Sequence, residues 1–202
     1  VRLAEDVGFE VLMVTVDSGV QQAAWQALAL GFQWPKGCDA AHDALQDEPL
    51  PRVQLADLIW LRSVTPLPIV VKGILHPEDA EAVKGLGFDG VVVSNHGGRT
   101  WDGVLASGVA LPEVRAAVGS AFPVLVDGGI RSGADVFKAL ALGANAVWVG
   151  RLPLMALAAG GALSAAHCLK LLTQELSYTM QVCGCEDVSK INSNLLRRAF
   201  LC

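Results

Sequence analysis

The chain has 202 residues, of which 52% are hydrophobic, and a formal net charge of −5. That length suits one domain, possibly two, with a sizeable core. The acidic balance argues against a nucleic-acid partner, because phosphate binding needs a basic surface. The longest charge-free run, Leu152–Leu169, is broken by a Pro and two Gly and is poor material for a membrane span. Five Cys with a single C-G-C pair predict reduced thiols in an intracellular compartment, and no His or Cys pair has metal-binding spacing.

Short β-branched runs alternate with helical patterns along the chain. The runs predict five strands, at Glu10–Val16, Pro68–Lys72, Gly90–Ser94, Pro123–Asp127 and Ala146–Gly150. The segments between them predict helices at Leu55–Ser63, Pro77–Leu86, Ala110–Val118 and Gly133–Leu142. The third helix is expected to begin near Pro112, and Ser132 is the expected N-cap of the fourth. This alternation predicts an α/β protein whose five strands lie parallel and adjacent in chain order.

Such units fit either an open doubly wound sheet or part of a closed (β/α)₈ barrel. Each strand is followed by polar or charged residues at its carboxyl end, among them Lys72, Asp127 and the sequence "SNHGGR". In a barrel these residues would meet at one face, where barrel enzymes keep their active sites, whereas an open sheet would spread them along a line. The sequence therefore favours a (β/α)₈ TIM barrel of which about strands 4–8 and the C-terminal helices are present.

The last two strand ends predict a phosphate site. "DGGIRSG" follows one strand and "GR" the next, so backbone N–H groups, two Arg side chains and a helix N-terminus would be available to one anion. Barrels often bind phosphate in the loops after strands seven and eight.

Together, the motifs "VTVDS", "VVKGILHPEDA", "VVVSNHGGR", a following "DG", and "VLVDGGIRSGADVFKALALGANAVWVGR" resemble the FMN-dependent α-hydroxy acid oxidases and dehydrogenases. That family includes glycolate, lactate and mandelate oxidising enzymes. The resemblance covers about residues 1–159 and is weaker in the C-terminal helices. It implies oxidation of a small (S)-2-hydroxy acid to the 2-oxo acid by bound FMN, with the flavin reoxidised by oxygen or another acceptor. It also implies a homo-oligomer, a tetramer in the family, in the cytoplasm or the peroxisome.

The resemblance assigns the chemistry to a few side chains. His96 matches the histidine that accepts a proton, and Asp17 matches the carboxylate that orients it. Arg99 matches the residue that binds the substrate carboxylate. Lys72 matches the cation beside the flavin, where negative charge grows on reduction. An Asp after a strand is also a common helix cap, so both interpretations of Asp17 stay open.

The remaining matches concern the cofactor. Two hydroxyl residues would bond the flavin ring, and a larger set would hold the ribityl chain and phosphate. The ring residues are Thr15 and Ser94, and the others are Asp127, Gly128, Gly129, Arg131, Gly150 and Arg151.

The chain also departs from the family pattern. Aligned without gaps, the family's second carboxylate-binding Arg falls on Ala24, and Leu152 stands where the family has Pro. The family's first barrel strands are missing, so residues 1–202 are expected to form an N-terminally incomplete FMN hydroxy acid dehydrogenase domain with two open sheet edges. Two alternatives stay open: a degenerate, non-catalytic FMN-binding paralogue or fragment, and another FMN-binding barrel such as a flavin-dependent isomerase.

Overall fold

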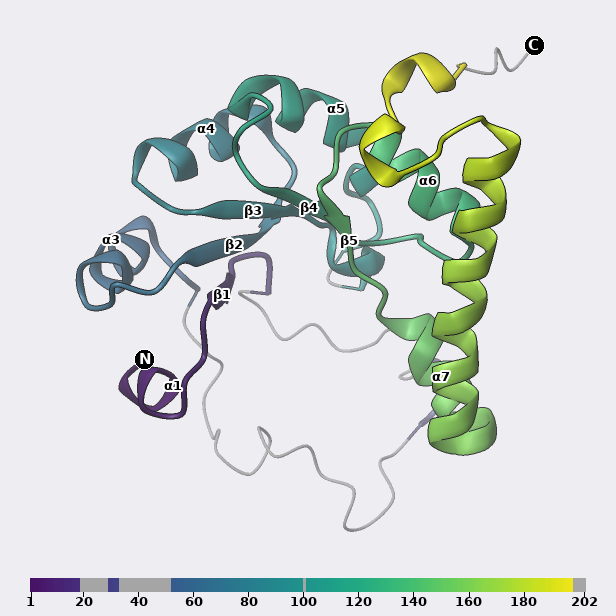
Figure 1. Cartoon of the computed structure of the whole chain (residues 1–202). Coiled ribbons are helices and arrows are strands. Elements are labelled where there is room, and N and C mark those ends of the chain that lie inside the picture. The colour runs from purple at the N-terminus through teal and green to yellow at the C-terminus, as the bar shows by residue number, and fades with distance from the viewer. Residues whose placement is uncertain (19–28, 33–51, 100, 198–202) are drawn as a thin grey trace.

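The computed structural model describes residues 1–18, 29–32, 52–99 and 101–197. Its centre is a five-stranded sheet in which every neighbouring pair is parallel and the order follows the chain, β1-β2-β3-β4-β5. The strands are β1 (Leu12–Thr15), β2 (Ile69–Ile74), β3 (Gly90–Val93), β4 (Val124–Val126) and β5 (Ala146–Val147). The predicted order and direction of the five strands are confirmed, and the arrangement is that of part of a barrel (Figure 1).

Helices follow the strands as predicted, and those after β2, β3 and β4 cover one side of the sheet (Figure 1). They are α1 (Arg2–Asp6), α3 (Leu55–Ser63), α4 (Pro77–Gly85), α5 (Ser107–Val118), α6 (Gly133–Ala141) and the long α7 (Arg151–Val182). Three short 3₁₀ turns, η2 (His96–Gly98), η3 (Val188–Lys190) and η4 (Ser193–Leu195), complete the described elements. Ser132 caps α6 as predicted, in a reciprocal capping box with Asp135.

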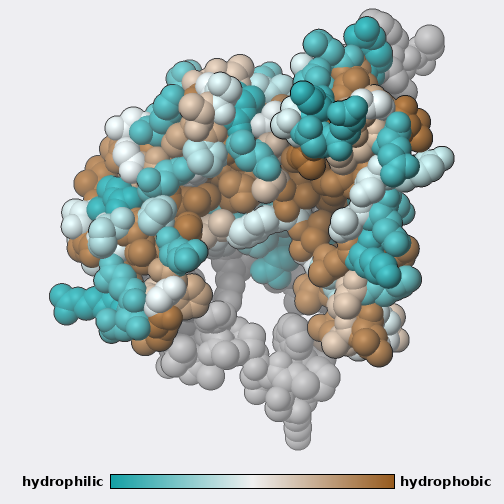
Figure 2. Space-filling model, viewed as in Figure 1, coloured by the Kyte–Doolittle hydropathy of each residue, from teal (hydrophilic) through white to brown (hydrophobic). Residues whose placement is uncertain are grey.

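Alternation along the strands divides their side chains between two faces. Those facing the helices form the core together with apolar residues of α4 and α5, and the strand members include Ile69, Val71, Val91, Val93, Val124 and Val126. Residues one position along, such as Lys72 and Leu125, point to the opposite face because the side-chain period of a strand is two. In Figure 2 brown hydrophobic surface lines the hollow between this opposite face and α7.

Helix α5 begins three residues before the predicted start. Its buried residues, Ser107, Ala110, Leu111, Val114 and Val118, follow a helical period that extends past Pro112 toward the N-terminus. Pro112 therefore lies inside the helix, where it leaves one carbonyl, that of Gly108, without its N–H partner. Gly108 is exposed, so water can hydrate that carbonyl.

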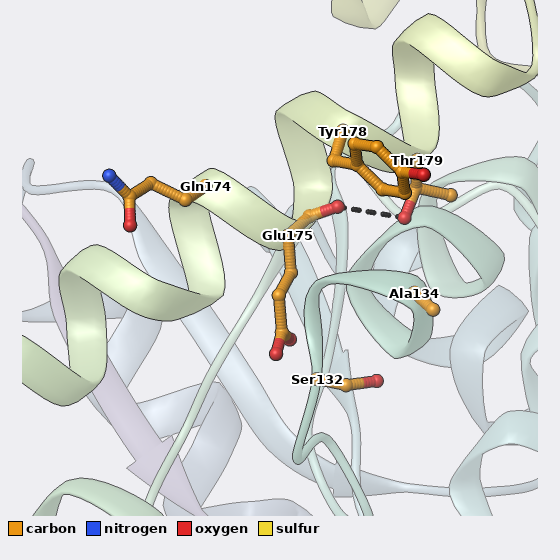
Figure 3. Close-up of a pocket in the computed structure, with 6 residues that line it drawn as sticks. All are labelled: Ser132, Ala134, Gln174, Glu175, Tyr178 and Thr179. Atoms are coloured by element: carbon orange, nitrogen blue, oxygen red, sulfur yellow. Dashed lines mark hydrogen bonds between the residues drawn. The ribbon is translucent and has the colours of Figure 1, made fainter.

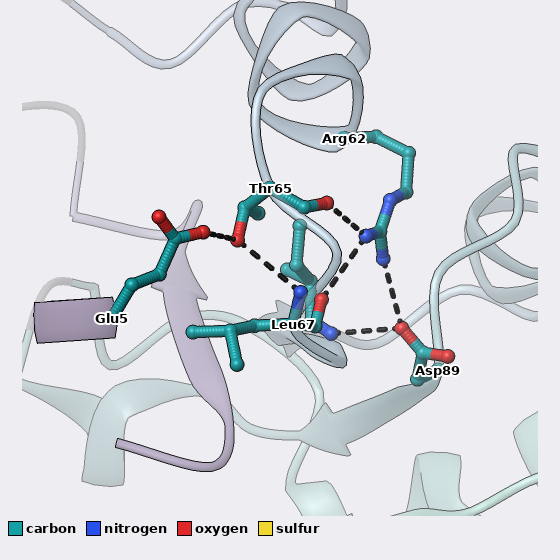
Figure 4. Close-up of polar contacts among 6 residues, drawn as sticks. Glu5, Arg62, Thr65, Leu67 and Asp89 are labelled. Carbon is teal, nitrogen blue, oxygen red and sulfur yellow. Dashed lines mark hydrogen bonds and ion pairs between the residues drawn. The ribbon is translucent and has the colours of Figure 1, made fainter. Parts of the chain in front are cut away.

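Polar networks fasten the amino ends of the strands. Arg62 of α3 forms an ion pair with Asp89 at 3.1 Å and donates to the carbonyls of Thr65 and Leu67 (Figure 4). The Thr65 hydroxyl in turn donates to Glu5 of α1. These bonds tie α1, α3 and the loops that begin β2 and β3 into one unit.

A second Arg performs the same task two strands along. Arg115 of α5 donates to the carbonyls of Gly143, Gly119 and Phe122 and to the side chain of Asn145, at 2.6–2.7 Å. Desolvation by burial lowers the pKa of its guanidinium from the ordinary value. The amino end of the sheet is thus held by Arg side chains whose partners are mainly backbone oxygens.

Helix α7 stands apart from the other helices in length and composition. With a window of mean hydropathy 1.5 it is long and apolar enough to cross a membrane by those two criteria alone. Two non-helical residues, Gly160 and Gly161, interrupt it, and such a break would leave backbone groups without partners in lipid. The expectation that no segment spans a membrane stays a prediction.

Candidate active site

The predicted site residues gather at the carboxyl ends of the strands. Thr15 ends β1 and is in register with Lys72 of β2, while Ser94 and Asp127 directly follow β3 and β4. A cleft of about 460 Å³ opens at this edge. Predicted site residues make up much of its wall: Lys72, His96, Arg99, Asp127, Gly128, Gly129, Arg131, Gly150 and Arg151. Thr15, Ser94 and Asp17 do not line the cleft. Ser94 and Asp17 nevertheless form hydrogen bonds with two residues that do, Lys72 and His96 respectively.

Lys72 forms the buried centre of the cleft. Its ammonium donates to the Ser94 hydroxyl at 2.9 Å and lies 3.3 Å from one carboxylate oxygen of Asp127. The side chains of Lys72 and Asp127 are only 10% and 17% exposed. The second oxygen of Asp127, Oδ1, is buried and has no hydrogen-bond partner among the described residues. A buried charged acceptor without a partner is unfavourable, so this position suits a ligand that brings a donor.

His96 and Asp17 are brought together from loops that follow different strands. The Nδ1 atom of His96 lies 3.1 Å from Oδ1 of Asp17, and both side chains are largely buried. The second ring nitrogen, Nε2, has no partner in the described part of the chain. An imidazole held through one nitrogen by a carboxylate presents the other as a base. Asp17 therefore makes the contact that the resemblance implies.

Gly73 makes room for this pair, and sequence reasoning gave it no role. A Cβ atom at this position would lie 2.6 Å from Cβ of Asp17 and 2.9 Å from its backbone nitrogen. Gly73 also has a φ of +109° and sits where the pairing of β2 with β3 shifts register. The available signal was a Gly directly after Lys72 at the end of an apolar run. This bulge extends β2 to Ile74, beyond the predicted end.

Arg99 follows the turn η2 and lines the cleft with an exposed side chain. Among the described residues no hydrogen bond or ion pair holds its guanidinium. Such a group is free to bind an anion, which is the role the resemblance implies. Ala24, where the family's second such Arg would fall, lies outside the described residues.

The predicted phosphate loops form the far wall of the cleft. Gly128 and Gly129 have φ values of +89° and +77°, so the chain turns here in a conformation that favours glycine. The side chain of Arg131 is without a partner in the described part of the chain. Arg151 instead donates to the carbonyl of Gly97 at 2.6 Å, joining this wall to the turn that carries His96.

Carboxylates already occupy several N–H groups at the start of the helix that follows "DGGIRSG". Asp135 accepts from the backbone N–H groups of Arg131 and Ser132, and Glu175 of α7 accepts from that of Gly133 at 2.7 Å. Figure 3 shows the Glu175 side chain reaching from α7 toward the start of α6. The start of α7 has no side-chain cap and lies on the cleft, so it is the helix N-terminus available to an anion.

The carboxylate of Asp135 is tuned by these contacts. Burial raises its pKa, but hydrogen bonds from the Ser132 hydroxyl and from the backbone N–H of Arg131 lower it, as does the nearby Lys138 cation. The net result is a pKa below the ordinary value. Asp135 therefore stays ionised as a cap of α6 at neutral pH.

Several apolar residues of the cleft escaped sequence reasoning, among them Trp148, Leu154 and Met155. Trp148 follows β5 and still donates its backbone N–H to Val126, so it continues the strand's alternation onto the face of Lys72. Leu154 and Met155 come from the first turns of α7. The two-residue period from Ala146 was the available signal for Trp148.

Comparison with known proteins gives one consistent result. The sequence profile of the family described as FMN-dependent dehydrogenase matches residues 1–198. An L-lactate oxidase of Alicycliphilus denitrificans is 44% identical, over 96% of this chain and 58% of its own length. A peroxisomal (S)-2-hydroxy-acid oxidase of Oryza sativa subsp. japonica is 42% identical, over 95% of this chain and 57% of its own.

Solved structures agree with these sequence matches. The crystal structure of a mandelate oxidase superposes with a TM-score of 0.87 at 42% identity, covering 95% of this chain and 57% of that one. The chain thus spans somewhat more than half the length of the relatives it matches.

Proposed function

Because the chain belongs to the FMN-dependent dehydrogenase family, we propose that it binds FMN in this cleft and oxidises a small (S)-2-hydroxy acid to the 2-oxo acid. One observation carries the proposal: a carboxylate-bound imidazole, a buried ammonium and a guanidinium that has no partner among the described residues line a single cleft. A base, a cation for developing negative charge and an anion clamp are the groups that this reaction requires.

The residues of the cleft fit FMN in size and donor set. A volume of about 460 Å³ lies within the range of roughly 300–1,000 Å³ usual for small-molecule sites. Oδ1 of Asp127, which has no partner in the described part of the chain, suits a ribityl hydroxyl, and Gly129, Arg131, Gly150 and the start of α7 suit a phosphate. When bound, FMN would supply the two-electron acceptor for the reaction.

The chain's own residues then divide the remaining work. Arg99 binds the substrate carboxylate in a bidentate pair, which orients the α-carbon. The substrate loses two electrons and two protons: the electrons and one proton pass to FMN, and His96 takes the other proton at Nε2. Asp17 holds the Nδ1 proton and stabilises the imidazolium that forms. Lys72 stabilises the negative charge that the flavin gains.

The wider biological setting is part of the proposal and rests on the resemblance. The acceptor that reoxidises the flavin is oxygen or another oxidant, and the assembly is a homo-oligomer. The compartment is cytoplasmic or peroxisomal, and the rice relative is named as peroxisomal.

The test is whether the purified chain binds FMN and whether a 2-hydroxy acid bleaches it. The chain is titrated with FMN, then mixed anaerobically with glycolate, lactate or mandelate while absorbance near 450 nm is followed. We expect at least one acid to reduce the flavin. His96→Gln is expected to retain FMN but to stop reduction. The matched control His76→Asn alters a histidine that caps α4 and does not line the cleft, with an Asn that caps equally well.

Three outcomes would each contradict a part of the proposal. If the chain binds no FMN, the cofactor assignment is wrong. If it binds FMN but no hydroxy acid reduces it, the chain is the non-catalytic FMN-binding form. Reduction by His96→Gln at the parent rate would remove His96 as the base.

A further inference from the structure

The backbone of His96 adopts an unfavourable conformation. Its φ is +55°, and no other non-glycine residue in the described part of the chain has a positive φ. A side chain in the left-handed region is disfavoured by contact of Cβ with the backbone. Residues held in this way persist only where the surrounding structure enforces the conformation, and they cluster at functional sites.

Two serines restrain the peptide groups on either side of Asn95. The N–H of His96 donates to the hydroxyl of Ser94 at 3.0 Å. The N–H of Asn95 donates to the hydroxyl of Ser107 at 3.2 Å, and that hydroxyl approaches Oδ1 of Asn95 at 3.4 Å. Ser107 is the first residue of α5 and is only 3% exposed. The turn that carries His96 is therefore anchored to a rigid helix rather than to its own strand alone.

The same pair borders the cofactor side of the cleft. A Cβ atom added to Gly128 would lie 3.2 Å from both Oδ1 of Asn95 and the Ser107 hydroxyl. The glycine at this position lets the loop after β4 pack directly on the pair. The Asn95–Ser107 pair thus contacts the loop of the base and the loop of the predicted cofactor cradle at once.

We propose that Ser107, acting through Asn95, is a positioning residue that holds the imidazole of His96 against Asp17. Ser107 is buried and does not line the cleft. Removing its hydroxyl leaves the N–H of Asn95 without a partner, so the turn can relax toward a negative φ and carry the ring away from Asp17. Its effect on catalysis rests on the proposed function, but its effect on the ring position does not.

The first test reads the His96 ring directly, without turnover. The ring signal is assigned in the ¹H–¹³C NMR spectrum of the full chain as the one missing in His96→Gln. Asp17→Asn then defines the shift that accompanies loss of the carboxylate contact. We expect Ser107→Ala to move the His96 signal in the same direction as Asp17→Asn. Ser107→Thr, which keeps a hydroxyl, is expected to restore the parent position.

Thr65→Val is the matched control. It also removes a buried hydroxyl with hydrogen bonds, but at the amino end of the sheet, and it should leave the His96 signal in place. An unmoved signal in Ser107→Ala, or an equal movement in Thr65→Val, would overturn the proposal. If Ser107→Ala does not fold, Ser107→Cys is read in the same way, because a thiol fills the site but bonds weakly.

The second test uses the FMN-loaded chain. We expect Ser107→Ala to slow flavin reduction at saturating substrate at least tenfold, with the Kd for FMN and the half-saturating substrate concentration within about twofold of the parent. If the parent chain reduces its flavin and Ser107→Ala does so equally fast, the positioning role in catalysis is wrong. If the parent does not reduce its flavin at all, the proposed function fails, and the NMR result alone decides the role of Ser107.

Discussion

Replacing Lys72 with Met is expected to destabilise the fold by leaving a carboxylate buried without its cation. The ammonium of Lys72 and the carboxylate of Asp127 are 3.3 Å apart, and their side chains are only 10% and 17% exposed. Removing one partner of a buried pair costs about 3–5 kcal/mol. The partial exposure of Asp127 lets water screen part of this loss, so we expect a value near the lower limit, about 3 kcal/mol.

A double-mutant cycle separates the ion pair from other effects of the substitution. Lys72→Met, Asp127→Asn and the double variant are unfolded in urea at pH 7, and the free energies of unfolding are compared with the parent. Because the double variant contains no unpaired buried charge, its loss should be smaller than the sum of the single losses by about 2 kcal/mol.

The chain contains a matched pair for comparison. Lys138 and Asp135 lie 3.7 Å apart on α6, with side chains 62% and 33% exposed. Exposed helix pairs of this spacing contribute about 0.2–0.5 kcal/mol, so the corresponding cycle should give a coupling of that size. A coupling between Lys72 and Asp127 no larger than that of the exposed pair would refute the reasoning about the buried centre of the cleft.

Three further predictions concern the phosphate wall and the helices beside it. Arg131→Gln should weaken FMN binding about 10- to 100-fold in a fluorescence titration, a larger loss of affinity than Lys72→Met causes. The free energy of unfolding should change little, because the Arg131 guanidinium has no partner among the described residues. Since the pKa of Asp135 is lowered in the fold, its contribution to stability is present above the ordinary carboxyl pKa and is lost as pH falls through the folded value. Urea unfolding should therefore show the parent more stable than Asp135→Asn at pH 6, with the difference shrinking below about pH 4. Gly133→Ala should destabilise by about 2 kcal/mol or more in urea, because its Cβ would collide with the backbone nitrogen of Leu176 in α7. Gly108→Ala, with open space around it, should be neutral or stabilising.

Most of the fold was predictable because its signals are local. Apolar runs of four to six residues, each followed by a helical pattern, specify parallel strands, and the crossover rule then orders them. The boundaries were less predictable, since they depend on contacts that the sequence does not display. The start of α5 is set by Ser107 bonding to Asn95, twelve residues earlier, and the end of β2 by a bulge at Gly73.

The candidate site divides in the same way. Lys72, His96 and Asp127 could be placed because each sits at a strand end, where topology alone brings them to one edge. Asp17 remained ambiguous because only the folded chain shows that its carboxylate meets His96. The hydrogen bond by which Glu175 caps α6 at Gly133 could not be predicted, since no local pattern indicates a contact between residues 42 positions apart.

The two ends of the sheet differ in how completely their polar groups are satisfied. At the amino end, Arg62 and Arg115 donate to carbonyl and side-chain oxygens that surround them. At the carboxyl end lie the two buried side-chain oxygens that lack a partner in the described part of the chain, Oδ2 of Asp17 and Oδ1 of Asp127.

The one left-handed non-glycine residue among those described, His96, lies at the carboxyl end as well. A fold that satisfies its groups elsewhere tolerates such local costs only where another requirement outweighs them. Asp127, whose Oδ1 has no partner among the described residues, and His96, whose backbone is left-handed, line the same cleft. Such groups are suited to binding a ligand. The contrast between the two ends therefore argues for a binding site at the carboxyl end independently of any resemblance to other proteins.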